Sequence, residues 1–355
     1  MESLATKYRP RSFSEVAGQK YIIDILQRQL RNSLMLSNCY LFAGPTGTGK
    51  TTLARIFANE LNKGCGTPIE IDAASNNGVD NIRAITEESQ LRSLDSEYRV
   101  YIIDEVHMIT REGWNAFLKT LEEPTATTVF LLCTTEPNKI PATILNRVMR
   151  FNLSKVSSEE IYNRLVYICM SEGFTNYEET CDYISKACQG GMRDAIAMLD
   201  ICSKHDSKLD VEYAQMSNGC VPFDTMIKLT NFIIDGSEKY VLSTLDEIYN
   251  AGYDLKVFVD QYLDFVLDLV KYSATKNICT TKFPAYLEEI RDEATNEVMS
   301  GCIKYVTGIQ DNVKYFNDMS RKLLDLKFKV KYDTSVRTTV GVFFTSILIT
   351  DGRAV

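Results

Sequence analysis

Residues 44–51 read GPTGTGKT, and three glycines in this run precede a lysine and a threonine. The apolar segment before the run ends at Phe42 and Ala43 and predicts a buried strand, while the apolar spacing after it predicts a helix. A glycine-rich turn between a strand and a helix N-terminus aims successive backbone N–H groups at a phosphate. We therefore expect Lys50 to reach the β- and γ-phosphates of a nucleotide and Thr51 to hold Mg²⁺. The alternative is a chance match in a flexible loop.

A second motif in a matching position argues against a chance match. Residues 100–103 are apolar and predict another buried strand, which runs into Asp104 and Glu105. An aspartate at the end of such a strand is suited to orient the ligands of Mg²⁺, and the glutamate beside it is suited to polarise an attacking water. The two motifs together predict hydrolysis of a nucleoside triphosphate.

A basic and aromatic arm, residues 4–13, precedes a turn at residues 16–19. Such an arm is either a solvated tail or, as in ATPases with this loop spacing, a cover over adenine and ribose. We expect the cover. The residues expected to contact the nucleotide are Tyr8, Arg9, Pro10, Val16, Gly18, Gly44, Pro45, Thr46, Gly47, Thr48, Gly49, Lys50, Thr51 and Thr52.

Strands and helices alternate through the first part of the chain. Further short strands are expected at residues 69–74 and 128–133, with helices between them. This order predicts an α/β domain, residues 1–152, whose parallel sheet carries its site at the carboxyl edge. Ser157 and Glu160 have the spacing of a capping box and open an expected helical lid domain, residues 153–218.

The remainder of the chain is expected to be helical. Its segments from about residue 221 onward are amphipathic to nearly all apolar, and a helix that is apolar on most sides must be covered. We therefore expect a collar or oligomerisation domain at residues 219–331. Residues 332–355 form a tail of unclear structure, in which the apolar, β-branched run 340–349 predicts either a strand or a closing helix.

The composition limits the class of protein. A chain of 355 residues with 45% hydrophobic and 24% charged residues is typical of a globular protein with two or three domains. A net charge of −8 means that any nucleic-acid contact needs a local patch or a surface shared with other subunits. No apolar run approaches the length of a membrane helix, so we expect a cytoplasmic protein without a membrane partner. The ten cysteines form no C-x-x-C pair and are expected to be reduced and mostly buried.

These motifs together resemble the bacterial or phage DNA polymerase III gamma/tau family, the ATPases of the sliding-clamp loader, in a short form without the tau extension. The stretches that carry the resemblance are 7–10 (KYRP), 16–19 (VAGQ), the phosphate loop, 70–83 (EIDAASNNGVDNIR), 101–108 (YIIDEVHM), 118–124 (LKTLEEP) and 191–195 (GMRDA). The resemblance implies an AAA+ module that uses ATP and Mg²⁺, with Lys50, Asp104 and Glu105 in the catalytic site.

The resemblance also implies roles for three residues outside the two nucleotide motifs. Thr135, or its neighbour Thr134, lies where the family has a polar sensor at the end of a strand. Arg193 matches the lid arginine that touches the γ-phosphate. Arg147 matches an arginine that enters the neighbouring subunit's ATP site in trans, although it is flanked here by other residues than in the family. The structural alternatives are that Arg147 caps its own helix and that Arg193 pairs on the lid surface.

The partners implied by the resemblance are other loader subunits in a ring, expected to be a pentamer, a sliding clamp, and primer-template DNA. The family usually carries a four-cysteine zinc module after the phosphate-loop helix, and here residues 62–68 contain Cys65 alone. One thiol cannot build a tetrahedral zinc site, so we expect no zinc.

The expected DNA surface is a helix start that follows the strand at 69–74. A helix N-terminus and an arginine one turn later suit phosphates, which is readout of shape rather than of sequence. The candidate residues are Asn76, Asn77 and Arg83, with Arg111 as a further candidate. The alternative is an ordinary solvated capping turn.

Other functions share part of this pattern. The small subunit of replication factor C and other AAA+ DNA motors share the phosphate loop, but the runs EIDAAS and DEVH favour the gamma/tau family. A non-hydrolysing structural subunit of the loader would not need both Lys50 and Glu105. A small-molecule kinase would need neither Glu105 nor the arginines at 147 and 193.

Overall fold

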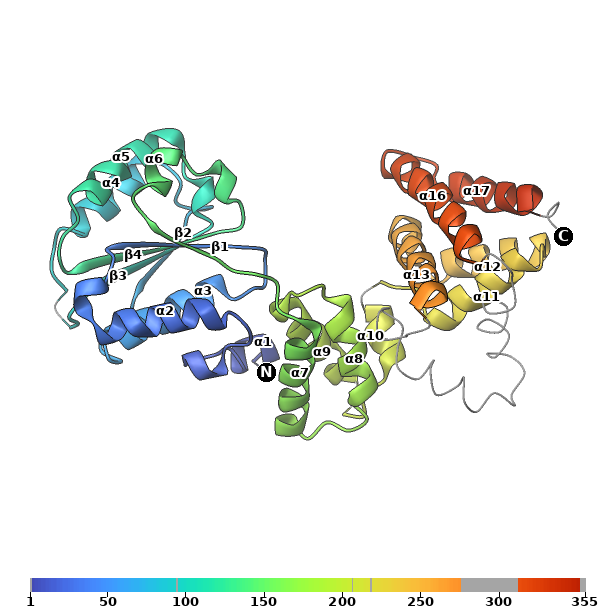
Figure 1. Cartoon of the computed structure of the whole chain (residues 1–355), viewed down its shortest axis with the longest axis horizontal. Helices are drawn as coiled ribbons and strands as arrows, with labels where there is room; N and C mark the ends of the chain where they lie inside the picture. Colours follow the sequence, from blue (N-terminus) through green and yellow to red (C-terminus); the bar gives the residue numbers. More distant parts are fainter. Residues whose placement is uncertain (1, 94, 206, 218, 276–311, 352–355) are drawn as a thin grey trace. The chain divides into compact units, whose positions relative to one another are not determined.

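The computed structural model describes residues 2–93, 95–205, 207–217, 219–275 and 312–351, and the chain divides into two compact units (Figure 1). Unit 1 consists of Met1–Ile168 and Cys188–Ala197, and unit 2 of Cys169–Ala187 and Met198–Val355. The domain boundaries expected after residues 152, 218 and 331 stay a prediction.

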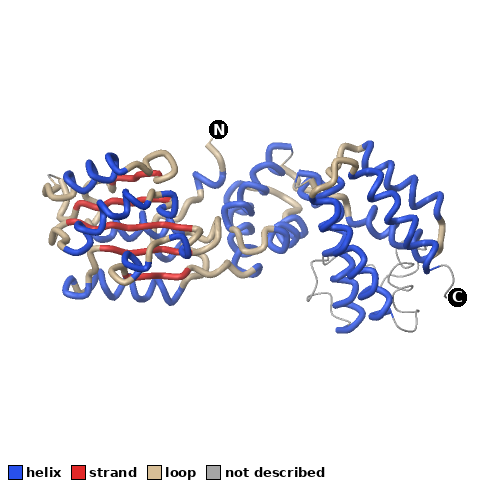
Figure 2. Tube along the Cα trace, turned by 90° about the horizontal axis from the view of Figure 1, so that it is seen from above, coloured by secondary structure: helices blue, strands red, loops and turns tan. Residues whose placement is uncertain are grey.

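Unit 1 contains a parallel sheet of five strands, drawn in red in Figure 2. The strands are β1 (Cys39–Ala43), β2 (Ile69–Asp72), β3 (Arg99–Asp104), β4 (Thr128–Thr134) and β5 (Met149–Asn152), and their order in the sheet is β2-β3-β4-β1-β5. Ala43 lies opposite Thr134, and Asp72 lies opposite Asp104. Because all pairs are parallel, the ends of β1, β3 and β4 meet at one edge. The expected α/β sheet is confirmed.

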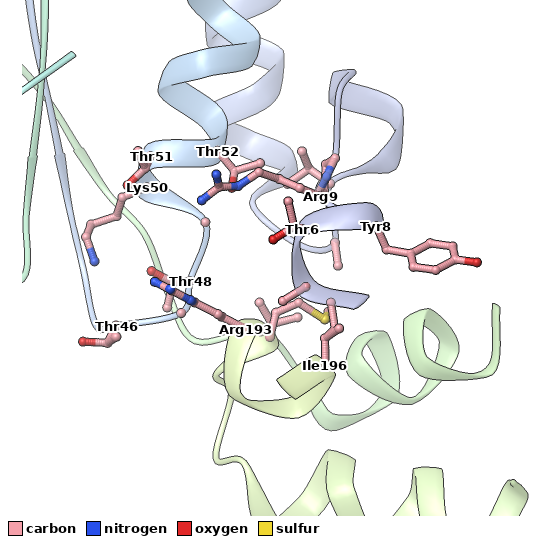
Figure 3. A pocket seen from close by; sticks show the side chains of 18 of the residues that line it. Thr6, Tyr8, Arg9, Thr46, Thr48, Lys50, Thr51, Thr52, Arg193 and Ile196 are labelled. Atoms are coloured by element: carbon pink, nitrogen blue, oxygen red, sulfur yellow. The ribbon is translucent and has the colours of Figure 1, made fainter. Parts of the chain in front are cut away.

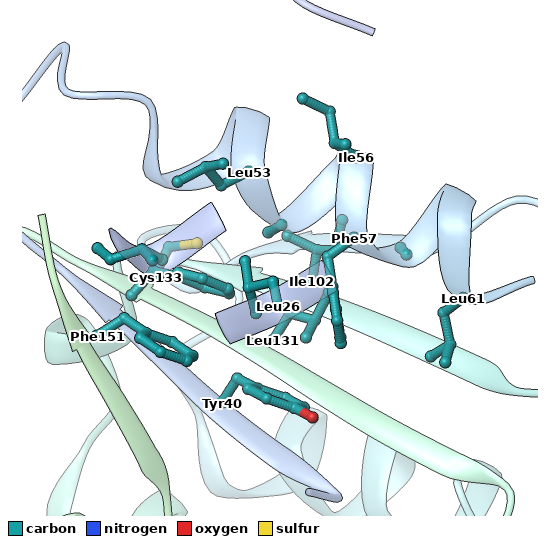
Figure 4. Close-up of a cluster of buried hydrophobic side chains, with 14 of the residues drawn as sticks. Leu26, Tyr40, Leu53, Ile56, Phe57, Leu61, Ile102, Leu131, Cys133 and Phe151 are labelled. Carbon is teal, nitrogen blue, oxygen red and sulfur yellow. The ribbon is translucent and has the colours of Figure 1, made fainter. Parts of the chain in front are cut away.

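Helices cover both faces of this sheet (Figure 1). On one face lie α2 (Lys20–Arg31) and α3 (Lys50–Leu61), and on the other α4 (Val79–Glu88), α5 (Arg111–Glu122) and α6 (Ala142–Leu145). The strands are apolar almost throughout because alternate side chains enter two cores. Figure 4 shows the core beneath α2 and α3, in which Tyr40, Ile102 and Leu131 are fully or almost fully buried. Residues one step along the strands, such as Leu41 and Ile103, enter the core beneath α4 and α5.

Short elements precede or connect the strands and helices of unit 1. They are α1 (Leu4–Lys7) and the 3₁₀ turns η1 (Phe13–Glu15), η2 (Ser33–Met35), η3 (Val106–Met108) and η4 (Pro137–Lys139). The helix α7 (Ser158–Glu172) starts as expected at a capping box. The backbone N–H of Glu160 donates to Ser157 Oγ at 3.2 Å, and the backbone N–H of Ser157 donates to Glu160 Oε2 at 3.2 Å.

Unit 2 is helical in its described part. Its elements, two of which begin or end in unit 1, are α7, α8 (Glu178–Ala187), α9 (Met192–His205), α10 (Val211–Ser217), α11 (Phe223–Ile234), α12 (Glu238–Asn250), α13 (Leu255–Thr275), α16 (Asn312–Lys331) and α17 (Val336–Asp351). Within it α13 packs along α16, and α17 packs on α12. A buried hydrogen bond of 2.9 Å joins the hydroxyls of Thr230 and Tyr262. Residues 276–311, which belong to the part of the chain expected to be helical, lie outside the described residues.

The cysteines of the described chain fit the expectation of reduced, mostly buried thiols. Cys39, Cys133, Cys169, Cys181 and Cys202 are buried, and none of the described cysteines is in a disulfide. Cys279 and Cys302 lie outside the described residues. No helix in the described ranges is both long and apolar enough to span a membrane.

Candidate nucleotide site

The loop between β1 and α3 has a backbone that requires glycine at two positions. Gly49, which precedes α3, has a φ of 96°, a left-handed conformation that glycine adopts without a steric penalty. A Cβ atom on Gly44 would lie 2.6 Å from the carbonyl oxygen of Leu153, so any side chain there would push the loop away from the segment after β5. The loop therefore has the open, helix-capping geometry that receives phosphates.

Lys50 places a cation inside this loop. Lys50 is only 7% exposed, and its Nζ donates to the carbonyl oxygens of Gly44 and Pro45, each at 3.0 Å. Burial lowers the pKa of Lys50, while the charges of Glu105 and Asp104 act in the opposite direction. A buried ammonium bound to neutral carbonyls gains stability when an anion enters the loop. This charge balance fits a nucleoside polyphosphate.

The first turn of α3 brings a hydroxyl to the end of β3. Thr51 Oγ1 donates to Asp104 Oδ2 at 2.7 Å, and Asp104 Oδ1 accepts from the backbone N–H of Glu105 at 3.0 Å. A threonine hydroxyl and a carboxylate are hard oxygen donors of the kind that Mg²⁺ prefers, beside phosphate oxygens and water. The residues present thus fit Mg²⁺ at the expected position.

Glu105 is held by residues at the end of β4. Its Oε2 accepts from Thr135 Oγ1 at 3.0 Å and from the backbone N–H of Thr135 at 3.4 Å, and lies 3.2 Å from His107 Nδ1. Thr134 Oγ1 is 3.2 Å from the same imidazole nitrogen. Glu105 itself has a φ of 47°, which points its side chain out of the strand direction. The carboxylate and the expected sensor threonine are therefore in direct contact.

A pocket of about 300 Å³ opens over these groups (Figure 3). Of the residues expected to contact the nucleotide, those that line it are Tyr8, Arg9, Pro10, Val16, Thr46, Gly47, Thr48, Gly49, Lys50, Thr51, Thr52 and Arg193, together with Asp104 and Glu105. Gly18, Gly44, Pro45 and Thr135 do not line it. Gly44 and Pro45 instead supply the carbonyls that hold Lys50.

The segment that carries Arg193 is attached directly to the phosphate loop. The backbone N–H of Met192 donates to the carbonyl oxygen of Gly47 at 3.2 Å, and Arg193 extends toward Thr48 (Figure 3). The ring of Tyr8, in contrast, points away from the loop and packs edge-on against Tyr167 with ring centroids 6.3 Å apart. The arm therefore borders the pocket, but not through the tyrosine ring.

Several residues of this site were missed from the sequence. The apolar wall formed by Val156, Met192 and Ile196 comes from segments far from the loop in sequence. Met192 lies in the run GMRDA, but no motif includes Val156 or Ile196. His107 had a signal, because it lies in the turn directly after Asp104 and Glu105. Its Nε2 lies 3.4 Å from Glu136 Oε1, so the ring is placed between two carboxylates.

Arg147 lies outside the pocket. Its Nη1 donates to the carbonyl oxygen of Thr143 in α6 at 2.6 Å, and its Nη2 forms an ion pair with Glu122 Oε1 at 2.7 Å. The side chain is 37% exposed. In this chain Arg147 thus caps its own helix, the alternative weighed for it, and it is not brought to the phosphate loop of the same chain.

The candidate DNA residues surround two neighbouring helix starts. The backbone N–H of Thr110, which precedes α5, donates to the carbonyl oxygen of Asn77, which precedes α4, at 3.3 Å. Arg111 is exposed at the first position of α5. Arg83 is 64% exposed and 3.4 Å from the also exposed Asp80. Asn76 uses its amide nitrogen within the turn, 3.1 Å from the carbonyl oxygen of Asp72.

No group of three or more His, Cys, Asp or Glu residues in the described ranges could hold a metal ion. Cys65 is exposed in the link between α3 and β2. The expectation that the chain binds no zinc stays a prediction.

Comparison with known proteins finds subunits of DNA polymerase III among the relatives of this chain. Residues 66–157 match the family described as "DNA polymerase III, delta subunit". The DNA polymerase III subunit tau of Bacillus subtilis is 36% identical, over 84% of this chain and 56% of that protein. The DNA polymerase III subunit gamma of Buchnera aphidicola subsp. Schizaphis graminum is 35% identical, over 74% of this chain and 78% of that protein. The chain spans about half the length of the tau relatives that it matches.

Among solved structures, the Thermotoga maritima RuvB Holliday junction branch migration motor superposes with a TM-score of 0.50 at 22% identity. The superposition covers 64% of this chain and 79% of that one. At this identity the likeness concerns the fold alone. Together with the parallel sheet and the helices that follow it, this likeness confirms the expected AAA+ architecture with helical domains.

Proposed function

Because the chain belongs to the DNA polymerase III gamma/tau family, we propose that it is the ATP-hydrolysing subunit of a sliding-clamp loader. In this function ATP binding drives opening of the clamp and its placement on primer-template DNA, and hydrolysis releases both. The observation that carries the proposal is the meeting of Lys50, the pair Thr51 and Asp104, and Glu105 at one edge of the sheet.

Each of these residues has a separate task. Lys50 exchanges its loop carbonyls for phosphate oxygens, and the backbone N–H groups of the loop bind the same polyphosphate. Thr51 and Asp104 would hold Mg²⁺, which neutralises the charge that develops on the phosphates. Glu105 orients and polarises the attacking water. Thr135 holds the Glu105 carboxylate, and Arg193 contacts the γ-phosphate from the lid segment.

The contacts of Glu105 support a regulated step. A carboxylate engaged by Thr135 and close to His107 must turn toward water before it can act as a base. Hydrolysis would then depend on a signal that shifts the end of β4 or the turn η3. The η3 turn leads within a few residues to Thr110 and Arg111, so DNA bound at the starts of α4 and α5 is a suitable source of that signal.

The partners of this function are other loader subunits in a ring, the sliding clamp, and primer-template DNA. Arg147, exposed and outside its own pocket, would act on the ATP of a neighbouring subunit. To do so it must leave Glu122, an exposed pair that costs little to break. A non-hydrolysing structural subunit is the second candidate, and the intact set of Lys50, Asp104 and Glu105 argues against it.

ATP hydrolysis by the chain assembled with its partner subunits tests the proposal. The rate should rise when primed DNA and a sliding clamp are added together, and less with either one alone. A four-way DNA junction serves as the control, because a branch-migration motor of the same fold would respond to it instead. A rate unaffected by primed DNA and clamp would contradict the proposed function.

A further inference from the structure

A second hollow in unit 1 lies between the N-terminal arm and α7, and the proposed function does not use it. It encloses about 470 Å³. The residues that line it, which we call the arm site, are Lys7, Tyr8, Arg9, Arg11, Ser14, Glu15, Arg164 and Tyr167. Four of them are cationic, two are tyrosines, and one is acidic. Tyr8 and Arg9 also line the nucleotide pocket and separate the two hollows.

The charge of the arm site is not balanced within it. Its one carboxylate, Glu15, accepts from the backbone N–H of Arg11 at 2.9 Å and from Ser12 Oγ at 3.2 Å. The arginine ion pairs of the described residues involve other arginines, not Arg9, Arg11 or Arg164. In a chain with a net charge of −8, such a concentration of arginine attracts an anionic ligand to one place.

The arm site is also held in shape. Arg164 Nη2 donates to the carbonyl oxygen of Tyr8 at 2.9 Å and so ties α7 to the arm. The guanidinium carbon of Arg164 lies 5.2 Å from the ring centroid of Tyr167, and the rings of Tyr8 and Tyr167 meet edge to face. Tyr167 is nevertheless 55% exposed. An aromatic surface open to solvent is thus fixed beside the cations.

This combination selects a class of ligand. Cations on long side chains bind phosphodiesters without demanding one geometry, and an exposed aromatic ring stacks on any unpaired base. We propose that the arm site binds single-stranded DNA. A duplex gains nothing from the tyrosine, because its bases are already stacked. An acidic peptide would use the arginines but would leave the ring without a planar partner.

The inference rests on the proposed function for the source of the strand, since primer-template DNA has an unpaired template beside the primer. The binding itself can be measured separately. Binding of a labelled oligothymidylate of about 20 nucleotides to the full chain is followed by fluorescence anisotropy at several salt concentrations. The variants are Tyr167→Ala and Arg11→Ala, which leave the residues of the nucleotide pocket in place.

Matched controls come from α2, outside the arm site. Tyr21 is 78% exposed there, so Tyr21→Ala removes an exposed ring, and Arg31→Ala removes an exposed arginine. Tyr167→Ala should weaken binding roughly tenfold, since base stacking is lost. Arg11→Ala should lower the slope of log affinity against log salt by about 0.7, the value for one phosphate contact on a single strand. Tyr167→Phe and Arg11→Lys keep the ring and the charge and should bind almost as the parent does.

Three outcomes would overturn the inference. The first is binding by Tyr167→Ala and Arg11→Ala that equals binding by the two α2 controls. The second is loss of oligothymidylate binding in Arg83→Ala with no loss in the arm-site variants, which would assign the strand to the starts of α4 and α5. The third is displacement of the oligonucleotide by polyglutamate as readily as by unlabelled oligothymidylate. If oligothymidylate binds as expected while clamp and primed DNA fail to stimulate ATP hydrolysis, the proposed function is wrong and the arm site stands.

Discussion

At the scale of single residues, chemistry in this chain depends on contacts between short sequence motifs. The phosphate loop and the Asp104–Glu105 pair could be predicted because each is a contiguous run with its own spacing. Glu105 and Thr135 could each be placed at the end of a strand. The hydrogen bond between them and the position of His107 beside Glu105 were not predicted. Such contacts depend on which strands are neighbours in the sheet, and the sequence motifs do not give that order.

Substitution of Glu105 separates binding from hydrolysis. Glu105→Gln keeps the size of the side chain and its ability to accept from Thr135, but it removes the charge that polarises water. We expect ATP hydrolysis in the assembled complex to fall by about 10²- to 10⁴-fold, with ATP affinity largely retained. Lys50→Ala is the comparison, because it should weaken ATP binding itself. Wild-type turnover in Glu105→Gln would show that another group activates the water.

At the scale of elements, the periodic patterns predicted most helices and four strands, and the exceptions have physical reasons. The strand β5 is only four residues long, and the alternation of its two apolar residues is too short to predict a strand. For the run at residues 340–349, the sequence left a strand and a helix as alternatives. The run lies in the helix α17, which packs on α12, α13 and α16. Tertiary packing decides such apolar, β-branched segments.

The starts of α4 and α5 should act together on DNA phosphates. Arg83→Ala and Arg111→Ala should each lower the DNA-stimulated part of ATP hydrolysis and reduce the salt slope of duplex binding by about one. Hydrolysis without DNA should not change. Arg28→Ala, an exposed arginine of α2 on the other face of the sheet, is the control. An unchanged response to DNA in both variants would leave these helix starts as ordinary solvated turns.

The capping box of α7 makes a prediction about stability. Ser157→Ala removes the side-chain acceptor for the backbone N–H of Glu160, which should lower the free energy of unfolding by about 1 kcal/mol. Glu160→Gln keeps an acceptor for the backbone N–H of Ser157 and should cost clearly less. Urea denaturation followed by circular dichroism measures both changes. A loss in Glu160→Gln as large as that in Ser157→Ala would mean that the charge of Glu160 contributes as much as the Ser157 acceptor, and no loss in Ser157→Ala would contradict the role of the cap.

At the scale of the whole molecule, the sequence predicted an AAA+ module followed by helices. Assembly with other subunits depends on contacts between chains, which the sequence of one chain does not specify. The contacts of Arg147 illustrate this limit. Within the chain it pairs with Glu122 and caps α6, and its role in trans needs a neighbouring subunit. The flanking residues of Arg147 differ from those of the family, so the role requires a direct test.

Mixing two inactive variants tests the role in trans. Arg147→Ala chains have an intact phosphate loop, and Lys50→Ala chains have an intact Arg147. Adjacent chains in one assembly should together form a complete site, since an arginine supplied in trans contributes about 10³- to 10⁵-fold in related phosphoryl transfers. We expect ATP hydrolysis to recover in the mixture. Normal hydrolysis by Arg147→Ala alone, or no recovery in mixed assemblies that demonstrably form, would remove Arg147 from the catalytic site.

The central claim, that ATP bound at this site drives clamp loading, is tested most directly by retention of a labelled sliding clamp on primed circular DNA. Loaders assembled with the wild-type chain, with Lys50→Ala and with Glu105→Gln are compared in the presence of ATP. The wild-type chain should leave free, topologically linked clamps on the DNA after gel filtration. Lys50→Ala should leave none, and Glu105→Gln should trap clamp, loader and DNA in one complex. Equal clamp retention with all three chains would contradict the claim.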